Sequence, residues 1–356
     1  MTTADKKPGI DKPGFDGEWV KLGDITKIIT GKLDANAANA NGRYPFFTCA
    51  EKALRIDTAA YDCECVLVAG NGDLNVKYYN GPFNAYQRTY IIESNSAADV
   101  CVPYLYHFLS YYVATLRAQS IGGVIKYIKL GNLKDARLPL PPLEKQKAVS
   151  SIFELIDKSK HECDKQLSNL NDLVKSQFVE MFGDPIANSH DLPLSKWSDV
   201  LAIRNGRNQK TVECDGGKFP ICGSGGEMGR ASSFITKGDS VIIGRKGNIN
   251  NPILMREAFW NVDTAFGLEP NNKVLTVEYL YNFCKWFDFE KLNKAVTIPS
   301  LTKADLLKLD MPLPPLPLQQ QFADFVAQVD KLRFDVQQQI ERLEILKQSL
   351  MQEYFG

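Results

Sequence analysis

The segment PLPPLEKQ at residues 139–146 decides the fold, because it returns as PLPPLPLQ at residues 312–319. The offset between the two copies stays constant along the following forty residues, so that Asp157 aligns with Asp330 and Gly183 with Gly356. A period this long excludes a solenoid of short stacked repeats. The chain therefore carries one kind of domain twice, and each copy ends in the same kind of segment.

The residues before each copy repeat more faintly. Lys21 aligns with Lys196, and Gly72 with Gly247, whereas most residues between such positions differ. We therefore expect one fold used twice with two different surfaces. The predicted class is α+β, with two mixed α/β domains related by a near two-fold axis. The predicted boundaries are a loose tail at 1–16, domains at 17–141 and 185–314, and helices at 142–184 and 315–356.

Each PLPPL segment opens an apolar stripe that steps by three and four residues, which is typical of a heptad seam. Proline suits this start, because the first helical turn leaves its backbone N–H groups unpaired. Each helix would hold roughly 40 residues and measure about 60 Å. The predicted seam consists of Val149, Ile152, Ile156, Leu167, Leu170, Val174, Phe325, Val329, Leu332, Val336, Ile340, Leu343 and Leu350.

These two helices are expected to pair with each other. Each carries a seam, and the chain offers one partner of equal length, joined by the short turn at 182–185. The prediction is an antiparallel coiled coil that separates the two domains, and pairing between molecules is the alternative. In each domain, short β-favouring runs alternate with Gly/Asn turns and precede an aromatic-rich helix, at 102–117 and 277–292. We interpret the aromatic stripe that includes Tyr104 and Phe108 as core packing.

Polar loops supply the candidate binding residues. Asn, Arg and Lys side chains address base edges or grip phosphates, although such loops taken alone are usually ordinary solvated turns. The candidates in the first domain are Lys27, Lys32, Arg43, Lys52, Asn71, Asn75, Lys77, Arg88 and Lys126. Those in the second are Arg204, Arg207, Ser224, Arg245, Lys246, Asn248, Asn250 and Lys303.

Composition limits the alternatives. With 42 basic and 42 acidic residues the net charge is zero, which argues against a protein that coats nucleic acid but allows a local basic groove. The eight cysteines show no CxxC spacing and there are three histidines, so we predict reduced thiols and no metal site. No long apolar run or signal peptide is seen, which predicts a cytoplasmic protein.

Catalytic motifs are missing from the sequence. Asn251-Pro252-Ile253-Leu254 lacks the aromatic residue that would hold a flipped base in a methyltransferase, and neither GxGxxG nor GxxxxGK[ST] occurs. We therefore predict no catalytic residue in this chain.

The chain resembles the specificity (S) subunit of Type I restriction-modification systems. The likeness rests on the paired PLPPL helix starts, the junction EMFGDP at 180–185 and the opening GEWVKLGDI at 17–25. It implies two target-recognition domains that each read half of a split double-stranded DNA target, and spacer helices that fix the gap and dock two DNA methyltransferase subunits. Restriction subunits complete the assembly in the prokaryotic cytoplasm. S-adenosylmethionine and ATP with Mg would bind those partners, so no cofactor is expected here.

Because the loops of the two domains differ, the resemblance implies an asymmetric bipartite target. Three other interpretations stay open. One is the specificity subunit of a related combined restriction-methylation enzyme of Type IIB kind. Another is a rod-like adaptor that binds proteins and not DNA. The third is a nuclease or methyltransferase with an unfamiliar motif.

Overall fold

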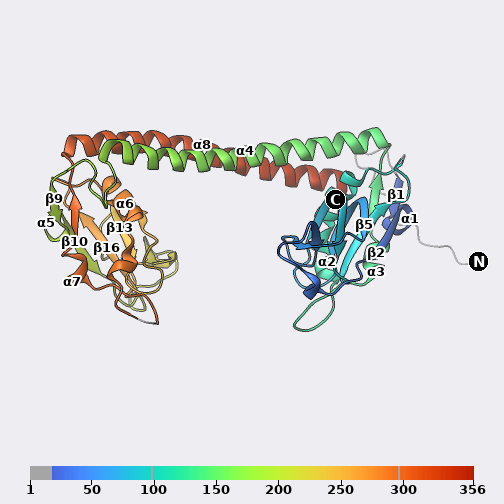
Figure 1. The fold of residues 1–356 in the computed structure, drawn as a ribbon, viewed down its shortest axis with the longest axis horizontal. Helices are drawn as coiled ribbons and strands as arrows, with labels where there is room; N and C mark the ends of the chain where they lie inside the picture. Colours follow the sequence, from blue (N-terminus) through green and yellow to red (C-terminus); the bar gives the residue numbers. More distant parts are fainter. Residues whose placement is uncertain (1–17, 98, 296) are drawn as a thin grey trace, which may run out of the picture. The chain divides into compact units, whose positions relative to one another are not determined.

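The computed structural model describes residues 18–97, 99–295 and 297–356, so the predicted tail at 1–16 lies outside the described residues. The chain divides into two compact units, Met1–Cys163 with Gln339–Gly356, and Asp164–Gln338. Two long helices, α4 (Leu143–Phe182) and α8 (Leu316–Phe355), contribute to both units (Figure 1). The boundary between the units therefore falls near the middle of each helix and not at its start, because each half of a helix packs on one globular head.

The head of the first unit is built on a six-stranded sheet whose spatial order is β2-β7-β5-β6-β3-β4. Its central strand reads CVLVA at 65–69 and is buried on both faces: Val66 and Val68 pack toward helix α2, while Cys65 and Leu67 belong to a second small core. Side chains alternate across a strand, so a continuous apolar run fits a strand covered on both sides. The strands are β1 (Glu18–Lys21), β2 (Thr26–Thr30), β3 (Tyr44–Phe47), β4 (Leu54–Ile56), β5 (Tyr61–Ala69), β6 (Val76–Ala85), β7 (Thr89–Ser94) and β8 (Arg137–Leu140).

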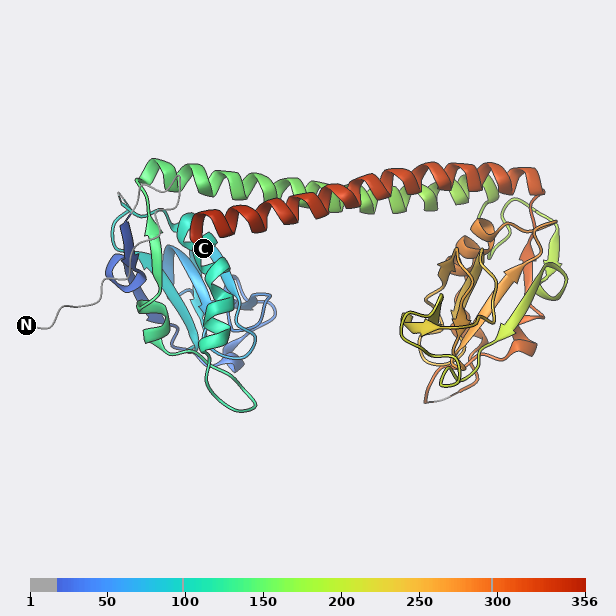
Figure 2. The ribbon, with the colours of Figure 1, turned by 180° about the vertical axis from the view of Figure 1, so that it is seen from behind.

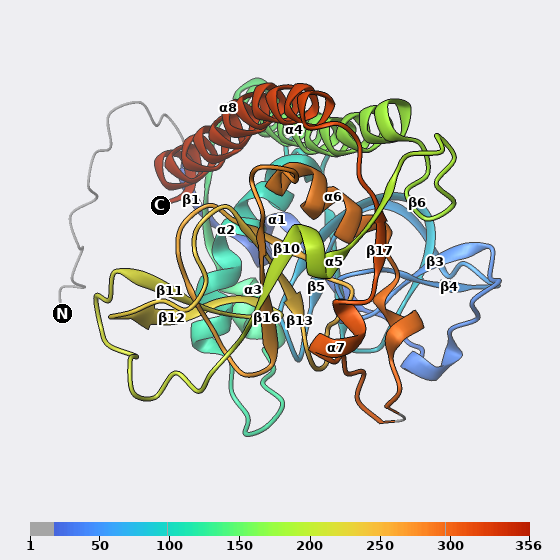
Figure 3. The ribbon, with the colours of Figure 1, turned by 90° about the vertical axis from the view of Figure 1, so that its left-hand side faces the viewer.

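The head of the second unit has strands equivalent to the central strands of the first head, but its strands form two separate sheets. Strands β10-β16-β13-β14 form one sheet, and β12-β11-β15 form another that extends to one side (Figure 3). The strands are β9 (Leu194–Lys196), β10 (Leu201–Asn205), β11 (Phe219–Gly223), β12 (Gly226–Ala231), β13 (Ser240–Gly244), β14 (Ile253–Met255), β15 (Trp260–Asn261), β16 (Ala265–Pro270) and β17 (Asp310–Pro312).

One longer helix covers each sheet, α2 (Val102–Gln119) in the first head and α6 (Val277–Trp286) in the second. Tyr104 and Phe108 are buried, which confirms the core interpretation of that stripe. Helix α6 ends sooner than predicted, and the rest of the expected helix is a 3-10 turn, η2 (Phe289–Leu292). The remaining short helices are α1 (Leu22–Ile25), η1 (Ala35–Ala37), α3 (Leu130–Lys134), α5 (Trp197–Val200) and α7 (Lys303–Leu306).

The duplication is visible in matched hydrogen bonds. The Tyr104 hydroxyl donates to the Pro139 carbonyl at 2.8 Å, and the Tyr279 hydroxyl donates to that of Pro312 at 2.6 Å. Two buried glutamines do the same work at the helix starts. Gln146 donates to the Asp99 and Pro141 carbonyls and accepts from the Cys101 N–H, all within 2.9 Å.

Gln319 repeats that arrangement with Val274, Pro314 and Thr276, again within 2.9 Å. A buried amide side chain with all of these partners satisfied holds its neighbours in one arrangement. The predicted repeat of one fold is therefore confirmed at the level of individual bonds.

The halves of α4 and α8 run antiparallel within each unit. In the first unit Asp157 contacts Lys347, Lys160 contacts Glu344, and the Cys163 thiol lies 3.8 Å from Gln339 Oε1. In the second, the Phe178 and Phe322 rings lie 5.4 Å apart. Residue numbers on α8 fall as those on α4 rise, which is the signature of antiparallel helices.

Eleven of the thirteen predicted seam residues are buried or half-buried, and the other two are exposed, so these two predictions are wrong. Ile152 is 37% exposed and Leu332 is 53% exposed. Their neighbours Phe153, which is fully buried, and Arg333, which donates to the Leu170 carbonyl, occupy those turns of the seam. One residue along a helix rotates a side chain by about 100°, so a one-residue error turns it to solvent. Of the other predicted members, those that are buried are Val149, Ile156, Val174, Val329, Val336 and Ile340, and those that are half-buried are Leu167, Leu170, Phe325, Leu343 and Leu350.

Candidate nucleic-acid interface

The turn after the central strand is the best-built candidate in the first unit. The Gly72 N–H donates to the Lys126 carbonyl at 2.9 Å, and the Ile128 N–H donates to that of Gly70 at 2.9 Å. The Gly70 N–H reaches the Arg88 carbonyl at 2.8 Å, where a Cβ on Gly70 would collide. Gly72 has a φ of +72°, which favours glycine. These bonds bring the predicted residues Asn71, Arg88 and Lys126 together.

Three more predicted residues join the edge of this cluster. Asn75 donates to the carbonyls of Cys49 at 2.8 Å and Asp73 at 3.0 Å, and it accepts a bond from Lys77. Burial lowers the pKa of Lys77. The hydrogen bonds of the Asn75 side chain thus hold the turn in place. Lys32 stands next to Leu33, whose carbonyl accepts from the Gln87 N–H at 2.8 Å.

Other candidates of the first unit lie elsewhere or carry other contacts. Lys27 sits within β2 and pairs with Glu93 at 3.5 Å. The Arg43 guanidinium lies over the Tyr44 ring at 5.4 Å, just before β3. Lys52 is exposed in the loop that follows Cys49, and the Cys49 thiol donates to the Arg88 carbonyl at 3.4 Å. Lys27 and Arg43 therefore do not belong to the cluster that the turn builds.

The second unit repeats the turn with other side chains. The Gly247 N–H donates to the Pro299 carbonyl at 3.0 Å, and the Leu301 N–H donates to that of Arg245 at 2.9 Å. The Arg245 side chain donates to the Asp263 carbonyl at 3.3 Å and lies over the Phe266 ring. Arg245 is thus half-buried, while Lys246 and Asn248 are exposed. Of the two cations in this turn, Lys246 is therefore the more accessible to a ligand.

Two other candidates of the second unit, Asn250 and Ser224, lie away from this turn or bond within the protein. The Asn250 amide donates to Asp288 at 2.8 Å and accepts from the Phe289 N–H at 2.7 Å, so it fastens η2 to the sheet. Both ends of this exposed side chain therefore hold bonds within the protein. Ser224 lies in the turn between β11 and β12, on the separate three-stranded sheet.

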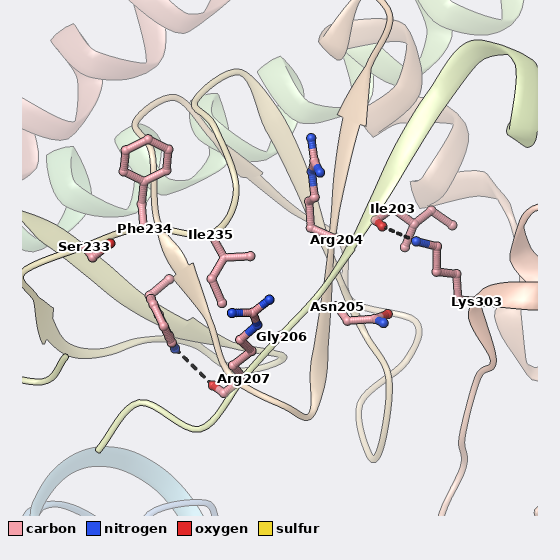
Figure 4. Close-up of a pocket in the computed structure, with 10 residues that line it drawn as sticks. Ile203, Arg204, Asn205, Gly206, Arg207, Ser233, Phe234, Ile235 and Lys303 are labelled. Atoms are coloured by element: carbon pink, nitrogen blue, oxygen red, sulfur yellow. Dashed lines mark hydrogen bonds between the residues drawn. The ribbon is translucent and has the colours of Figure 1, made fainter. Parts of the chain in front are cut away.

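A cavity of about 620 Å³ gathers three other predicted cations, Arg204, Arg207 and Lys303 (Figure 4). Arg204 pairs with Glu269 at 2.7 Å, and this carboxylate raises the pKa of the guanidinium. Lys303 donates to the Ile203 carbonyl at 2.8 Å. Because Phe234 and Trp260 line the same cavity, it offers flat apolar surface beside positive charge.

Sequence reasoning missed Phe234 and Trp260. They come from segments that follow β12 and form β15, and no spacing in the sequence marks their meeting with β10. Within residues 18–97, 99–295 and 297–356 no helix is long and apolar enough to cross a membrane. The same described residues hold no group of three or more His, Cys, Asp or Glu that could bind a metal ion.

Two duplicated heads with matched polar turns, each packed on long helices, define a class of bipartite binding protein. The sequence model of the Type I restriction modification DNA specificity domain matches the chain twice, at residues 16–171 and 192–344. The protein therefore belongs to this family.

Relatives of known kind agree with this assignment. The Escherichia coli EcoDI specificity subunit is 40% identical over 141 residues, which cover 40% of this chain and 31% of that protein. The Methanocaldococcus jannaschii MjaVIII specificity subunit is 23% identical over 57% of this chain and 53% of its own length. The matches thus span about a third and about half of these two relatives.

Solved structures show the same fold. The crystal structure of the S subunit of a Type I restriction-modification system from M. genitalium matches 97% of this chain and 98% of its own, with 17% identity and a TM-score of 0.66. A chain from a study of assembly and conformational transition in the type I R-M system covers 97% and 99%, at 17% identity and a TM-score of 0.61.

Proposed function

We propose that this chain is the DNA-recognition subunit of a Type I restriction-modification complex, and that each unit reads one half of an asymmetric bipartite target. The observation that carries the proposal is the pair of matched turns. The same backbone bonds present Asn71 in one head and Lys246 in the other. One scaffold with exchanged side chains is what two different half-sites require.

The chemistry of the two turns suits DNA. Asparagine bonds adenine edges bidentately, and lysine contacts guanine or phosphate. Phosphate contacts position a protein on the duplex, and base contacts specify the sequence. In the second head, Arg207 and Lys246 supply the cations for such contacts.

Partners supply the catalysis in this proposal. Two methyltransferase subunits bind the duplicated helix surfaces and carry S-adenosylmethionine, and restriction subunits carry ATP and Mg. The chain itself contributes recognition and spacing, without catalytic residues. The names of the matched relatives support this assignment, since both are specificity subunits of Type I restriction enzymes.

The test is to express the chain with its methyltransferase subunit in a host and to map every methylated base. We expect one bipartite motif with two different halves, and a complex of two methyltransferase subunits for each copy of this chain. Methylation without a shared motif would overturn the proposal and favour the adaptor interpretation. Cleavage by the same complex without separate restriction subunits would favour the Type IIB-like enzyme.

A further inference from the structure

The loop at 120–128 in the first unit carries apolar side chains at an exposed tip. Val124 is 104% exposed and Ile125 is 63% exposed, and the loop projects from the end of α2 (Figure 2). Exposed apolar residues are common singly on protein surfaces, so exposure alone decides nothing. The informative features are how this loop is held and what its counterpart carries.

The loop is fixed by backbone bonds on both sides. Ile121 and Tyr127 exchange N–H donors at 3.0 and 2.9 Å, and Lys126 and Ile128 bond to the turn that holds Asn71. Gly122 has a φ of +119°, and a Cβ there would collide with the Ile125 carbonyl. The base of the loop is therefore fixed, which reduces the conformational entropy lost when the tip binds.

The second unit places an isoleucine at the matching position. Ile298 is 60% exposed, and the following residues Pro299 and Leu301 bond to the turn that holds Lys246. Asn293 braces this loop by accepting from the N–H groups of Ala295 and Ser300 at 3.0 and 3.1 Å. The neighbours of the two isoleucines differ: Val124, Lys126 and Tyr127 become Thr297, Pro299 and Ser300.

We propose that Ile125 and Ile298 are matched wedges that insert between base pairs of each half-site and unstack them. The proposal rests on the proposed DNA-binding function. Residues that read sequence are expected to differ between the heads, as Asn71 and Lys246 do. A residue kept in both heads serves what both half-sites share, which is the stacked duplex. Isoleucine is among the side chains that proteins insert as wedges between base steps.

Charge beside each tip supports DNA as the occupant. Lys126 follows Ile125 directly, and Arg88 is bonded through Gly70 to the same turn. In the second head Lys246 pairs with Ser300 in a β-bridge, two residues beyond Ile298. An apolar tip beside cations fits a duplex, whose phosphates flank an apolar stack of bases.

The test uses the chain with its methyltransferase subunit and duplexes that carry 2-aminopurine at single half-site positions other than the methylated base. We expect a fluorescence increase at one step in each half-site on binding. Ile125→Ala should abolish the increase in the first half-site only, Ile298→Ala in the second only, and each should weaken binding about tenfold. Val124→Ala, at the more exposed neighbour, is the matched control and should leave both signals.

Several results would overturn the wedge. An unchanged signal in the Ile125→Ala/Ile298→Ala double variant would do so, as would an equal loss in Val124→Ala. Lost preference for thymine at one position without unstacking would assign these residues to methyl contacts. Lost assembly with the methyltransferase, with DNA binding intact, would assign them to a protein interface. A wild-type complex with no sequence preference would instead overturn the proposed function itself.

Discussion

The two heads share a backbone frame but carry different side chains on it. In both, the turn after the central strand bonds to the loop that follows the covering helix, yet Asn71 stands in one turn and Lys246 in the other. Outside this frame the sheets diverge, with six strands in one head and a split of four and three in the other. A frame shared by both heads keeps the core of the fold while the side chains on the turns change.

The same comparison separates contacts that serve the frame from contacts that serve a ligand. Asn75 and Asn250 are equivalent in the repeat, and both side-chain amides form hydrogen bonds within the protein. Asn71 and Lys246 are also equivalent, and they stand on the turns themselves. Residues of the first kind should change stability when substituted, and residues of the second kind should change binding.

The largest expected effect comes from the helices that the heads share. The contacts of Lys160 with Glu344 and of Cys163 with Gln339 place Ser159–Lys165 opposite Gln338–Glu344. Deleting both heptads keeps the seam and shortens each helix by about 10 Å. At about 3.4 Å per base pair, the methylated motif should lose up to roughly three base pairs from its gap.

The half-site bases should stay unchanged in that deletion variant, because neither head is altered. Sequencing of methylated sites is the measurement. Changed half-site bases with an unchanged gap would contradict the division between reading heads and spacing helices.

The next effect tests whether the frame is equally strong in both heads. Gln319→Leu leaves the Thr276 N–H and the Val274 and Pro314 carbonyls without this partner in a buried site. We expect a loss of about 3 kcal/mol in the free energy of unfolding, and the same for Gln146→Leu. Urea unfolding of the purified chain measures it, with the exposed Gln320→Leu as control. A loss near zero in one head alone would break the equivalence.

These frame contacts also show what the sequence could predict. The repeated PLPPL segment and the heptad stripe are enough to predict a duplication and two long paired helices. A periodic pattern of apolar residues persists even when individual residues are substituted. The stripe could not distinguish Ile152 from Phe153, since both are apolar and the register depends on what the head places against the helix. Nor could it show that Asn250 bonds to η2 or that Trp260 donates to the Arg207 carbonyl, because those contacts join segments distant in the chain.

A smaller effect should distinguish the heads by pH. His107 is buried with neither ring nitrogen bonded among the described residues, while the equivalent Asn282 donates to the Glu278 carbonyl at 2.9 Å. Burial, and then nearby Lys347, lowers the pKa of His107 from 6.5 to about 4, against the opposing effect of Asp157. A lowered histidine pKa means that the unfolded chain binds the proton more readily. Stability is therefore full above pH 6.5 and falls as the pH drops toward 4.

Between pH 7 and pH 5 we expect a loss of about 2 kcal/mol in the free energy of unfolding from this group. His107→Asn, which copies the second head, should remove that part of the pH dependence. His161→Asn, at an exposed position of α4, is the control and should not. Equal pH profiles for the wild type and His107→Asn would show that the ring is solvated or paired in solution.

The smallest effect concerns the turns themselves. Lys246→Ala should weaken DNA binding by about 1 kcal/mol and reduce the slope of log affinity against log salt by about one, if the ammonium grips a phosphate. Asn71→Ala removes no charge, so its salt slope should match that of the wild type, and its loss should be confined to one base position. The reciprocal variant Asn71→Lys should increase the slope of log affinity against log salt, because it adds a cation at the first half-site. If Lys246→Ala instead leaves the salt slope intact and relaxes one base position, then lysine reads a base edge, and the two heads use equivalent positions for the same task with different partners.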